Sequence, residues 1–214
     1  MSAEPEFSGL RGRFFAWFLS GPGRRVLEWK MGKPEPRILE LLQLQGGERV
    51  LDAGCGSGFH SLLVAERVPQ GSVLAVDVST EMLDRMRKRV AARGLTERVE
   101  ILQADGLDLP TPDSSVDRAM SAAVWHHLDD PQRACGELVR VLRSGGRVVV
   151  SDLEIKPSGH EHGGHGHGGK GHGRHGHDRP FGPDDMARIL EQAGLVNVTV
   201  EMVGRWILGA GDKP

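Results

Sequence analysis

An acidic residue followed by three alternating glycines stands out in the sequence VLDAGCGSG, residues 50–58. The apolar start of this sequence is typical of a buried strand that ends at Asp52. The glycines are Gly54, Gly56 and Gly58. Glycine allows a sharp turn and lets a ligand approach the backbone closely. The apolar residues that follow predict a helix, whose first amides can bind a polar ligand group. The pattern indicates a nucleotide-type cofactor site in a doubly wound α/β fold.

The spacing G-x-G-x-G differs from the G-x-G-x-x-G of dinucleotide-binding proteins and argues against NAD and FAD. Asp77 ends the next apolar run, about 20 residues further on, where an acidic side chain accepts hydrogen bonds from both ribose hydroxyls. The same carboxylate would repel a 2′-phosphate, which argues against NADP. The alternative is that Asp77 only caps the helix that follows.

The glycine motif resembles motif I of the class I S-adenosylmethionine (SAM) dependent methyltransferases. The resemblance is to the small-molecule type related to the ubiquinone and menaquinone biosynthesis enzymes. It covers about Glu48 to Ser151, with an especially similar run at 125–152, and returns in Trp206-Ile207-Leu208 and at Lys213-Pro214. Ser144 departs from the family, which often has proline before the two glycines.

The resemblance implies a set of SAM-binding residues along the chain. They are Asp52, Gly54, Cys55, Gly56, Gly58, His60, Asp77, Val78, Met82, Ala104, Asp105 and Gly106. Asp105 would accept from the adenine amine, or else is a solvated loop acid. Met82 would pack on adenine or ribose, or else belongs to the core. Asp52 would orient the turn or bind the methionine amino group through water, and His60 would lie near the cofactor carboxylate.

His126 and His127 follow the expected fourth strand, where an acceptor would meet the methyl group. A histidine here is a candidate general base near neutral pH. The alternative is that neither takes a proton, because a sulfonium methyl is a strong electrophile and in-line positioning supplies most of the effect.

Alternating apolar strands and helices predict an α/β fold, with a doubly wound, Rossmann-like, seven-stranded sheet. The expected strands are 50–51, 73–76, 99–102, 116–121, 147–153, 196–203 and 205–208, and the expected helices are 38–42, 80–93, 131–142 and 181–193. The last two strands are separated by Gly204 alone, which predicts an antiparallel hairpin at the end of a mostly parallel sheet.

Two segments lie outside this pattern. Residues 1–48 mix aromatic and basic side chains and are interpreted as an N-terminal helical lid, with residues 49–214 forming the methyltransferase domain. The alternative for the first segment is a helix on a membrane surface, although Gly21-Pro22-Gly23 interrupts it early.

The second segment, 159–177, is a flexible insert of glycine and histidine that cannot build a core. Its histidines are His160, His162, His165, His167, His172, His175 and His177. Imidazole suits Zn, Ni, Cu and Co, so loose binding of several ions is one reading. The other reading is a low-complexity insert without a biological ligand.

The composition sets the remaining limits. The chain has 214 residues, 38% of them hydrophobic, a net charge of −2 and two cysteines. A net charge this small does not favour nucleic acid, and two cysteines do not make a disulfide framework. No apolar run reaches transmembrane length, which leaves peripheral membrane contact open. We therefore expect a cytoplasmic protein.

Together these features predict a SAM-dependent methyltransferase that acts on a small-molecule or lipidic acceptor. The alternative is a metal-handling or metal-sensing protein on a methyltransferase scaffold. A metalloid methyltransferase would join both halves, but the arsenic enzymes rely on several cysteines. The acceptor, the atom methylated and the oligomeric state do not follow from the sequence.

Overall fold

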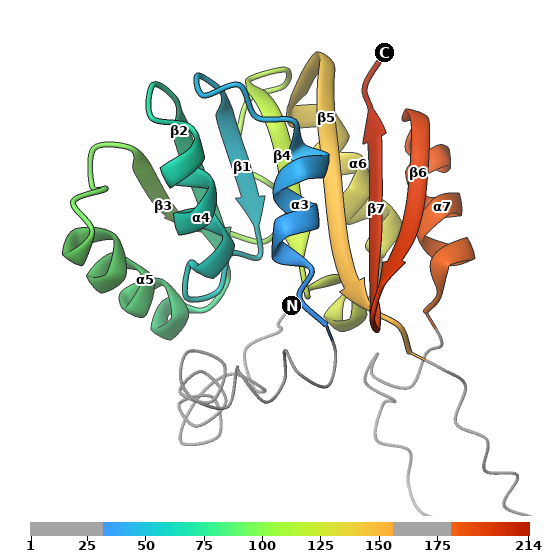
Figure 1. Cartoon of the computed structure of the whole chain (residues 1–214), viewed down its shortest axis with the longest axis horizontal. Coiled ribbons are helices and arrows are strands. Elements are labelled where there is room, and N and C mark those ends of the chain that lie inside the picture. The colour runs from blue at the N-terminus through green and yellow to red at the C-terminus, as the bar shows by residue number, and fades with distance from the viewer. Residues whose placement is uncertain (1–31, 156–180) are drawn as a thin grey trace, which may run out of the picture.

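The computed structural model describes residues 32–155 and 181–214 and shows a sheet covered by helices on both faces (Figure 1). The strands are β1 (Arg49–Ala53), β2 (Ser72–Asp77), β3 (Val99–Gln103), β4 (Val116–Ala122), β5 (Leu142–Leu153), β6 (Val196–Val203) and β7 (Trp206–Asp212). The helices are α3 (Glu35–Leu42), α4 (Phe59–Arg67), α5 (Thr80–Ala92), η1 (Trp125–His127), α6 (Pro131–Val141) and α7 (Pro183–Gln192).

The sheet has the order β3-β2-β1-β4-β5-β7-β6. The first five strands run parallel, and β7 is antiparallel to both β5 and β6. This confirms the predicted α/β fold with seven strands and an antiparallel C-terminal hairpin. β7 extends to Asp212 and is longer than expected, and Gly204 and Arg205 together form the turn between β6 and β7.

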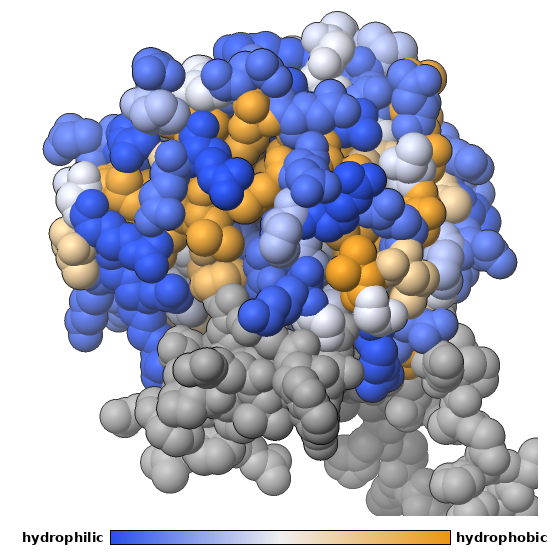
Figure 2. Space-filling model, viewed as in Figure 1, coloured by the Kyte–Doolittle hydropathy of each residue, from blue (hydrophilic) through white to orange (hydrophobic). Residues whose placement is uncertain are grey.

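Each face of the sheet has its own hydrophobic core. Figure 1 shows α3, α4 and α5 on one face, with α6 and α7 on the other. Alternate residues of each strand divide between them: Val50 and Met120 pack with the first group, whereas Leu51 and Val148 pack with the second. Figure 2 views the first face, where hydrophilic side chains cover most of the surface and hydrophobic ones show in the gaps between them.

Helix α3 belongs to the core of the domain. Its Ile38 and Leu42 are buried among the residues of the first core, and Arg147 of β5 donates from Nε to the Leu41 carbonyl at 2.7 Å. The C-terminal part of the expected lid segment is thus part of the sheet packing. Residues 1–31, which carry the aromatic cluster of that prediction, lie outside the described residues.

The two described residues that flank the insert, Ile155 and Phe181, pair with each other. Ile155 and Phe181 form an antiparallel bridge in which each amide donates to the other's carbonyl at 3.0 Å. The histidine segment at 159–177 lies between these residues and outside the described part. The sequence-based helix at 181–193 is shorter in the structure, because Phe181 is used for this bridge and α7 begins at Pro183.

Candidate functional site

The residues nominated for SAM binding follow the carboxyl ends of β1, β2 and β3, which are neighbours in the sheet. Backbone hydrogen bonds join these ends. The Gly54 amide donates to the Val76 carbonyl at 2.8 Å, and the Ala104 amide donates to the backbone carbonyl of Asp77 at 3.1 Å. The structure therefore brings the residues of three separate sequence segments to one edge. In a parallel α/β sheet this edge is where ligands bind.

The carboxylate of Asp77 is the central polar group at this edge. Its Oδ2 accepts from the Gly56 amide at 2.8 Å and its Oδ1 accepts from the Ser79 amide at 2.9 Å. Burial raises the pKa of Asp77, while the amide hydrogen bonds act in the opposite direction. An ionised carboxylate has about four acceptor positions, so these amides leave acceptor capacity for a hydroxyl group of a ligand.

The three glycines of the turn have different environments. All have positive φ, from 52° to 80°. A Cβ on Gly54 would lie 2.3 Å from Val124 Cγ2, and one on Gly58 would lie 2.6 Å from Met86 Cγ, so both positions are required by packing. A Cβ on Gly56 would have no atom of residues 32–155 or 181–214 within 4 Å. Gly56 thus faces open space of the kind a ligand would occupy.

Asp52 lies beneath the turn and holds the helix that follows it. It is buried, and its Oδ2 accepts from the Ser61 hydroxyl of α4 at 2.5 Å. Burial raises the pKa of Asp52 to about 7, against the opposing effect of the Ser61 hydrogen bond. Asp52 therefore holds α4 against the strand that leads into the turn, in keeping with the predicted role of orienting the turn. Binding of the methionine amino group through water stays a prediction.

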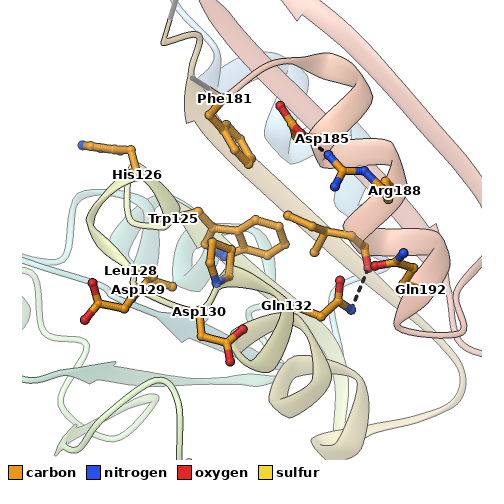
Figure 3. Close-up of a pocket in the computed structure, with 12 residues that line it drawn as sticks. Trp125, His126, Leu128, Asp129, Asp130, Gln132, Phe181, Asp185, Arg188 and Gln192 are labelled. Carbon is orange, nitrogen blue, oxygen red and sulfur yellow. Dashed lines mark hydrogen bonds and ion pairs between the residues drawn. The ribbon is translucent and has the colours of Figure 1, made fainter. Parts of the chain in front are cut away.

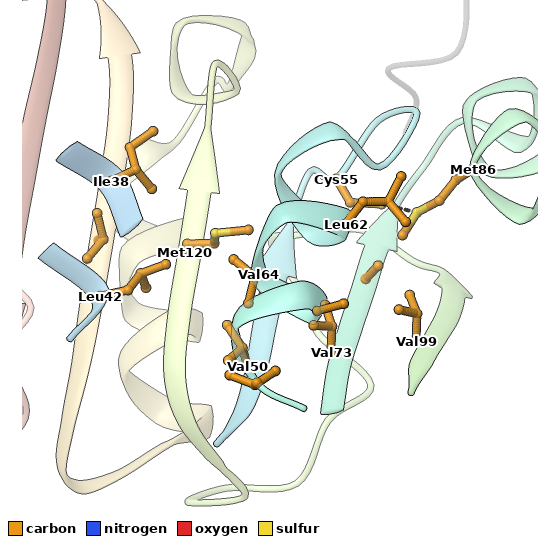
Figure 4. Packing of buried hydrophobic residues seen from close by; sticks show 14 of the residues in the cluster. Ile38, Leu42, Val50, Cys55, Leu62, Val64, Val73, Met86, Val99 and Met120 are labelled. Atoms are coloured by element: carbon orange, nitrogen blue, oxygen red, sulfur yellow. Dashed lines mark hydrogen bonds between the residues drawn. The ribbon is translucent and has the colours of Figure 1, made fainter. Parts of the chain in front are cut away.

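Cys55 contributes its backbone to the turn, because its side chain points into the core. Figure 4 shows the thiol directed at Met86, and the two sulfur atoms are 3.6 Å apart. Burial raises the pKa of the Cys55 thiol well above its ordinary value. The Cys55 amide donates to the Val76 carbonyl at 3.0 Å.

The residues nominated for adenine line the neighbouring ends of β2 and β3. Val78 is 38% exposed, which is unusual for a large apolar side chain in this fold. Asp105 is exposed and its Oδ1 accepts from the Leu107 amide at 2.9 Å. Met82 is half-buried one turn into α5. His60, on the first turn of α4, lies edge-on to Phe59 with ring centroids 5.1 Å apart.

Next to the glycine turn, the loop after β4 forms the short helix η1, which carries both nominated histidines. His126 is held by Asp152 of β5, a residue that the sequence interpretation did not select. The ring Nδ1 of His126 lies 2.5 Å from Asp152 Oδ1, and its backbone amide donates to Asp152 Oδ2 at 2.9 Å. The His127 ring lies against that of His126, with centroids 3.8 Å apart.

A shallow hollow lies beside η1, between the start of α6 and α7 (Figure 3). Trp125 and Phe181 form its apolar part, and both are buried. Arg188 at its rim pairs with Asp185, and Gln132 donates to the Ile189 carbonyl at 3.3 Å. His126 stands at the far side of this hollow from Gln192 (Figure 3).

The prediction of metal binding depends on the histidine segment. Within residues 32–155 and 181–214, no group of three or more His, Cys, Asp or Glu side chains is arranged to hold a metal ion. The seven histidines nominated for metals lie outside those ranges. In the same ranges, no helix is long and apolar enough to cross a bilayer.

Comparison with known sequences finds similarity to methyltransferases over the part of the chain that carries the glycine turn. A family model described as "Methyltransferase domain" matches residues 51–150. Demethylmenaquinone methyltransferase of Thermus thermophilus is 37% identical over 123 residues, which are 58% of this chain and 55% of that protein. The 27-O-demethylrifamycin SV methyltransferase of Amycolatopsis mediterranei is 32% identical over 57% of this chain and 44% of its own length. The chain thus spans about half the length of these curated relatives.

Solved structures agree with the fold. A SAM dependent methyltransferase from Aquifex aeolicus has a TM-score of 0.71 and 26% identity, and the match covers 93% of this chain and 96% of that chain. Phosphoethanolamine N-methyltransferase 2 of Haemonchus contortus, solved with SAM, has a TM-score of 0.71 at 17% identity, over 100% of this chain and 60% of that chain. At 17% identity this second likeness concerns the fold alone. Residues 51–150 therefore match a methyltransferase domain, and the chain shares the fold of a solved SAM-dependent methyltransferase.

Proposed function

We propose that this protein transfers the methyl group of SAM to a small-molecule or lipidic acceptor. The observation that carries the proposal is the Asp77 carboxylate, which fixes the Gly56 amide and keeps acceptor positions for ribose hydroxyls. SAM supplies a methyl group on a positively charged sulfonium, which needs a nucleophile held in line with it. The open space at Gly56 has room for a cofactor against the backbone.

In this proposal each strand end binds one part of SAM. Asp77 takes the ribose, while Val78, Met82, Ala104, Asp105 and Gly106 surround the adenine. The glycine turn takes the methionine part, which directs the methyl group toward η1. Val124 supports this direction because it packs on Gly54 and leads directly into η1.

The acceptor class follows from the relatives only as a proposal. Their names include methyltransferases of demethylmenaquinone and of 2-methyl-6-phytyl-1,4-hydroquinone, which are lipidic quinone-type molecules. One relative is named arsenite methyltransferase, with 41% identity over 50% of this chain. Only Cys55 and Cys135 are present here and both are buried, so an organic acceptor fits these residues better. A cytoplasmic location is part of the same proposal.

Calorimetry with SAM and S-adenosylhomocysteine tests cofactor binding. Turnover is tested with methyl-labelled SAM and a cell extract, with and without a chelator. Labelled product in both conditions supports the methyltransferase. Metal uptake by a protein that neither binds SAM nor yields labelled product would favour the metal-handling alternative.

A further inference from the structure

Asp152 is a fully buried carboxylate at the carboxyl end of β5. Its exposed fraction is 0%, and such a group is costly to bury unless hydrogen bonds compensate for the lost water. Three bonds do so. The Leu153 amide donates to Oδ1 at 2.7 Å, the His126 amide donates to Oδ2 at 2.9 Å, and the His126 ring contacts Oδ1 through Nδ1 at 2.5 Å.

These contacts fix the protonation pattern of the His126 ring. An ionised carboxylate only accepts hydrogen bonds. With Asp152 ionised, the third bond therefore requires Nδ1 to carry the hydrogen and donate it. A neutral imidazole has one hydrogen on its two nitrogens. Nε2 of His126 therefore presents a lone pair, which is the form a general base needs.

The backbone of η1 is held as firmly as the ring. The two carboxylate oxygens of Asp152 bond one residue, His126, at both its amide and its side chain. The Ala123 amide donates to the Ser151 carbonyl at 2.8 Å, which ties the start of this loop to β5. On the other side, Val124 packs on Gly54 of the glycine turn. The base is therefore fixed relative to the turn that receives the cofactor.

We propose that Asp152 is the positioning residue that makes His126 the general base, and that the acceptor carries an ionisable hydroxyl group. This inference rests on the proposed methyl transfer. The hydroxyl proton passes to Nε2 of His126, the oxygen attacks the methyl carbon, and the carbon–sulfur bond breaks. Where a ring carbon conjugated with that oxygen attacks instead, it afterwards loses its own hydrogen to water as a proton, which restores the aromatic ring. S-adenosylhomocysteine leaves neutral, and the imidazolium releases its proton to water.

The geometry separates the two neighbouring histidines. The His126 ring contacts Asp152 through Nδ1, whereas Nδ1 of His127 is buried. Its side chain is 14% exposed, so it is enclosed yet still reachable from the strand edge. The carboxylate behind it keeps the ring in one orientation, which is how an adjacent acid assists a histidine base.

The first test reads the tautomer directly and needs no acceptor. Nitrogen-15 NMR of histidine-labelled protein, above the pH at which histidine is protonated, should show His126 with its hydrogen on Nδ1. His127→Asn assists the assignment by removing the neighbouring signal. In Asp152→Asn the amide group donates to Nδ1, and the hydrogen should move to Nε2. A His126 ring that carries its hydrogen on Nε2 in the wild-type protein would overturn the proposal.

The second test measures methyl transfer from labelled SAM to three hydroxyl probes: 1,4-dihydroxynaphthalene, catechol and benzyl alcohol. We expect transfer to at least one of them. Asp152→Asn should lower kcat about 100-fold or more, the usual contribution of a general base, with SAM affinity unchanged. Asp152→Glu, which keeps the carboxylate, should recover part of the rate and serves if the first variant does not fold.

Asp117→Asn is the matched control. Asp117 lies near the amino end of β4, whereas Asp152 lies at the carboxyl end of β5. Asp117 accepts from the Arg49 amide at 2.8 Å, and its substitution should leave kcat unchanged. Normal SAM binding with no transfer to any hydroxyl probe would overturn the acceptor class. A wild-type protein that does not bind SAM would instead refute the proposed function, whichever nitrogen of His126 carries the hydrogen.

Discussion

The carboxylate of Asp77 accepts a hydrogen bond from the Gly56 amide at 2.8 Å, so the end of β2 holds the turn that follows β1. The two residues are 21 positions apart in the sequence. A single side chain therefore both shapes the glycine turn and supplies the acceptors proposed for ribose. Substitution at this position should affect the turn and the ligand together.

Asp77→Ala should weaken SAM binding by about 1–3 kcal/mol, the range for a lost charge-assisted hydrogen bond. The loss arises because both the ribose acceptors and the contact to Gly56 disappear. Calorimetry with SAM and S-adenosylhomocysteine measures it. Asp84→Ala is the control, since Asp84 is exposed on α5 and forms an ion pair with Arg87. Equal affinity of Asp77→Ala and wild type would contradict the ribose assignment.

The residues at the strand ends were predictable from sequence because their signals are local. Asp77 ends an apolar run, and Ser79 caps α5 by accepting from the Met82 amide, as the Ser-Thr-Glu sequence predicts. The partner of His126 was not predictable in this way. Asp152 lies 26 residues away, and only the adjacency of β4 and β5 brings the two together.

The boundary between α6 and β5 was also displaced from the prediction. The two glycines at 145–146 predict a loop, but β5 already begins at Leu142. The Gly145 amide donates to the Lys213 carbonyl at 2.8 Å, and Lys213 donates from Nζ to Leu142 at 2.7 Å. The C-terminal residues thus extend the strand through pairing that no local pattern contains.

Gly54→Ala should destabilise the protein more than Gly56→Ala. Both positions have positive φ, which an alanine resists, but only at Gly54 would the new methyl group meet Val124, at 2.3 Å. Val124→Ala should therefore reduce the damage of Gly54→Ala in a double-mutant cycle. Urea unfolding of the four proteins measures the coupling energy. Strict additivity would show that Val124 does not pack on the turn in solution.

Gly56→Ala gives the complementary result. Its Cβ would meet no atom of the described residues within 4 Å, so the fold should tolerate it apart from the strain of its φ of 52°. The methyl group would enter the space proposed for SAM, so affinity should fall more than stability does. Calorimetry alongside urea unfolding compares the two, and an unchanged affinity would place SAM away from Gly56.

Asp52→Asn should change how stability depends on pH. Burial raises the pKa of Asp52 from 3.8 to about 7, so the folded state binds its proton more tightly than the unfolded chain. The contribution of Asp52 to the free energy of unfolding is greatest below about pH 4, and it decreases as the pH rises to about 7. Asparagine keeps an acceptor for Ser61 without a charge and removes this decline. Urea unfolding at pH 5 and pH 8 should show a smaller difference for Asp52→Asn than for wild type and for an Asp113→Asn control, and equal differences would contradict it.

Removal of residues 1–31 should abolish turnover while SAM binding remains. The expected acceptor cover lies in this segment, which is outside the described residues. SAM is proposed to bind the ends of β1, β2 and β3, which are hydrogen-bonded to one another. The closest described residue, Gly32, lies against the β6–β7 turn, where a Cβ would be 3.0 Å from the Val203 carbonyl. Full activity of the truncated protein with an acceptor found for the whole chain would exclude the lid.

Replacement of residues 156–180 by a Gly-Ser linker should remove metal binding and leave methyl transfer nearly unchanged. The bridge between Ile155 and Phe181 holds the two ends together, so a linker of about two to five residues can join them as in a hairpin. The seven histidines among glycines can offer several imidazole sets, but ordering such a chain costs entropy at each residue, which favours moderate binding of several ions over one rigid site.

Nickel or zinc uptake by the whole chain should also decrease below about pH 6, because imidazole binds metals only when neutral. Metal titrations and rates of labelled transfer for both proteins check this. A hundredfold lower rate with intact SAM binding would mean that the segment takes part in the reaction.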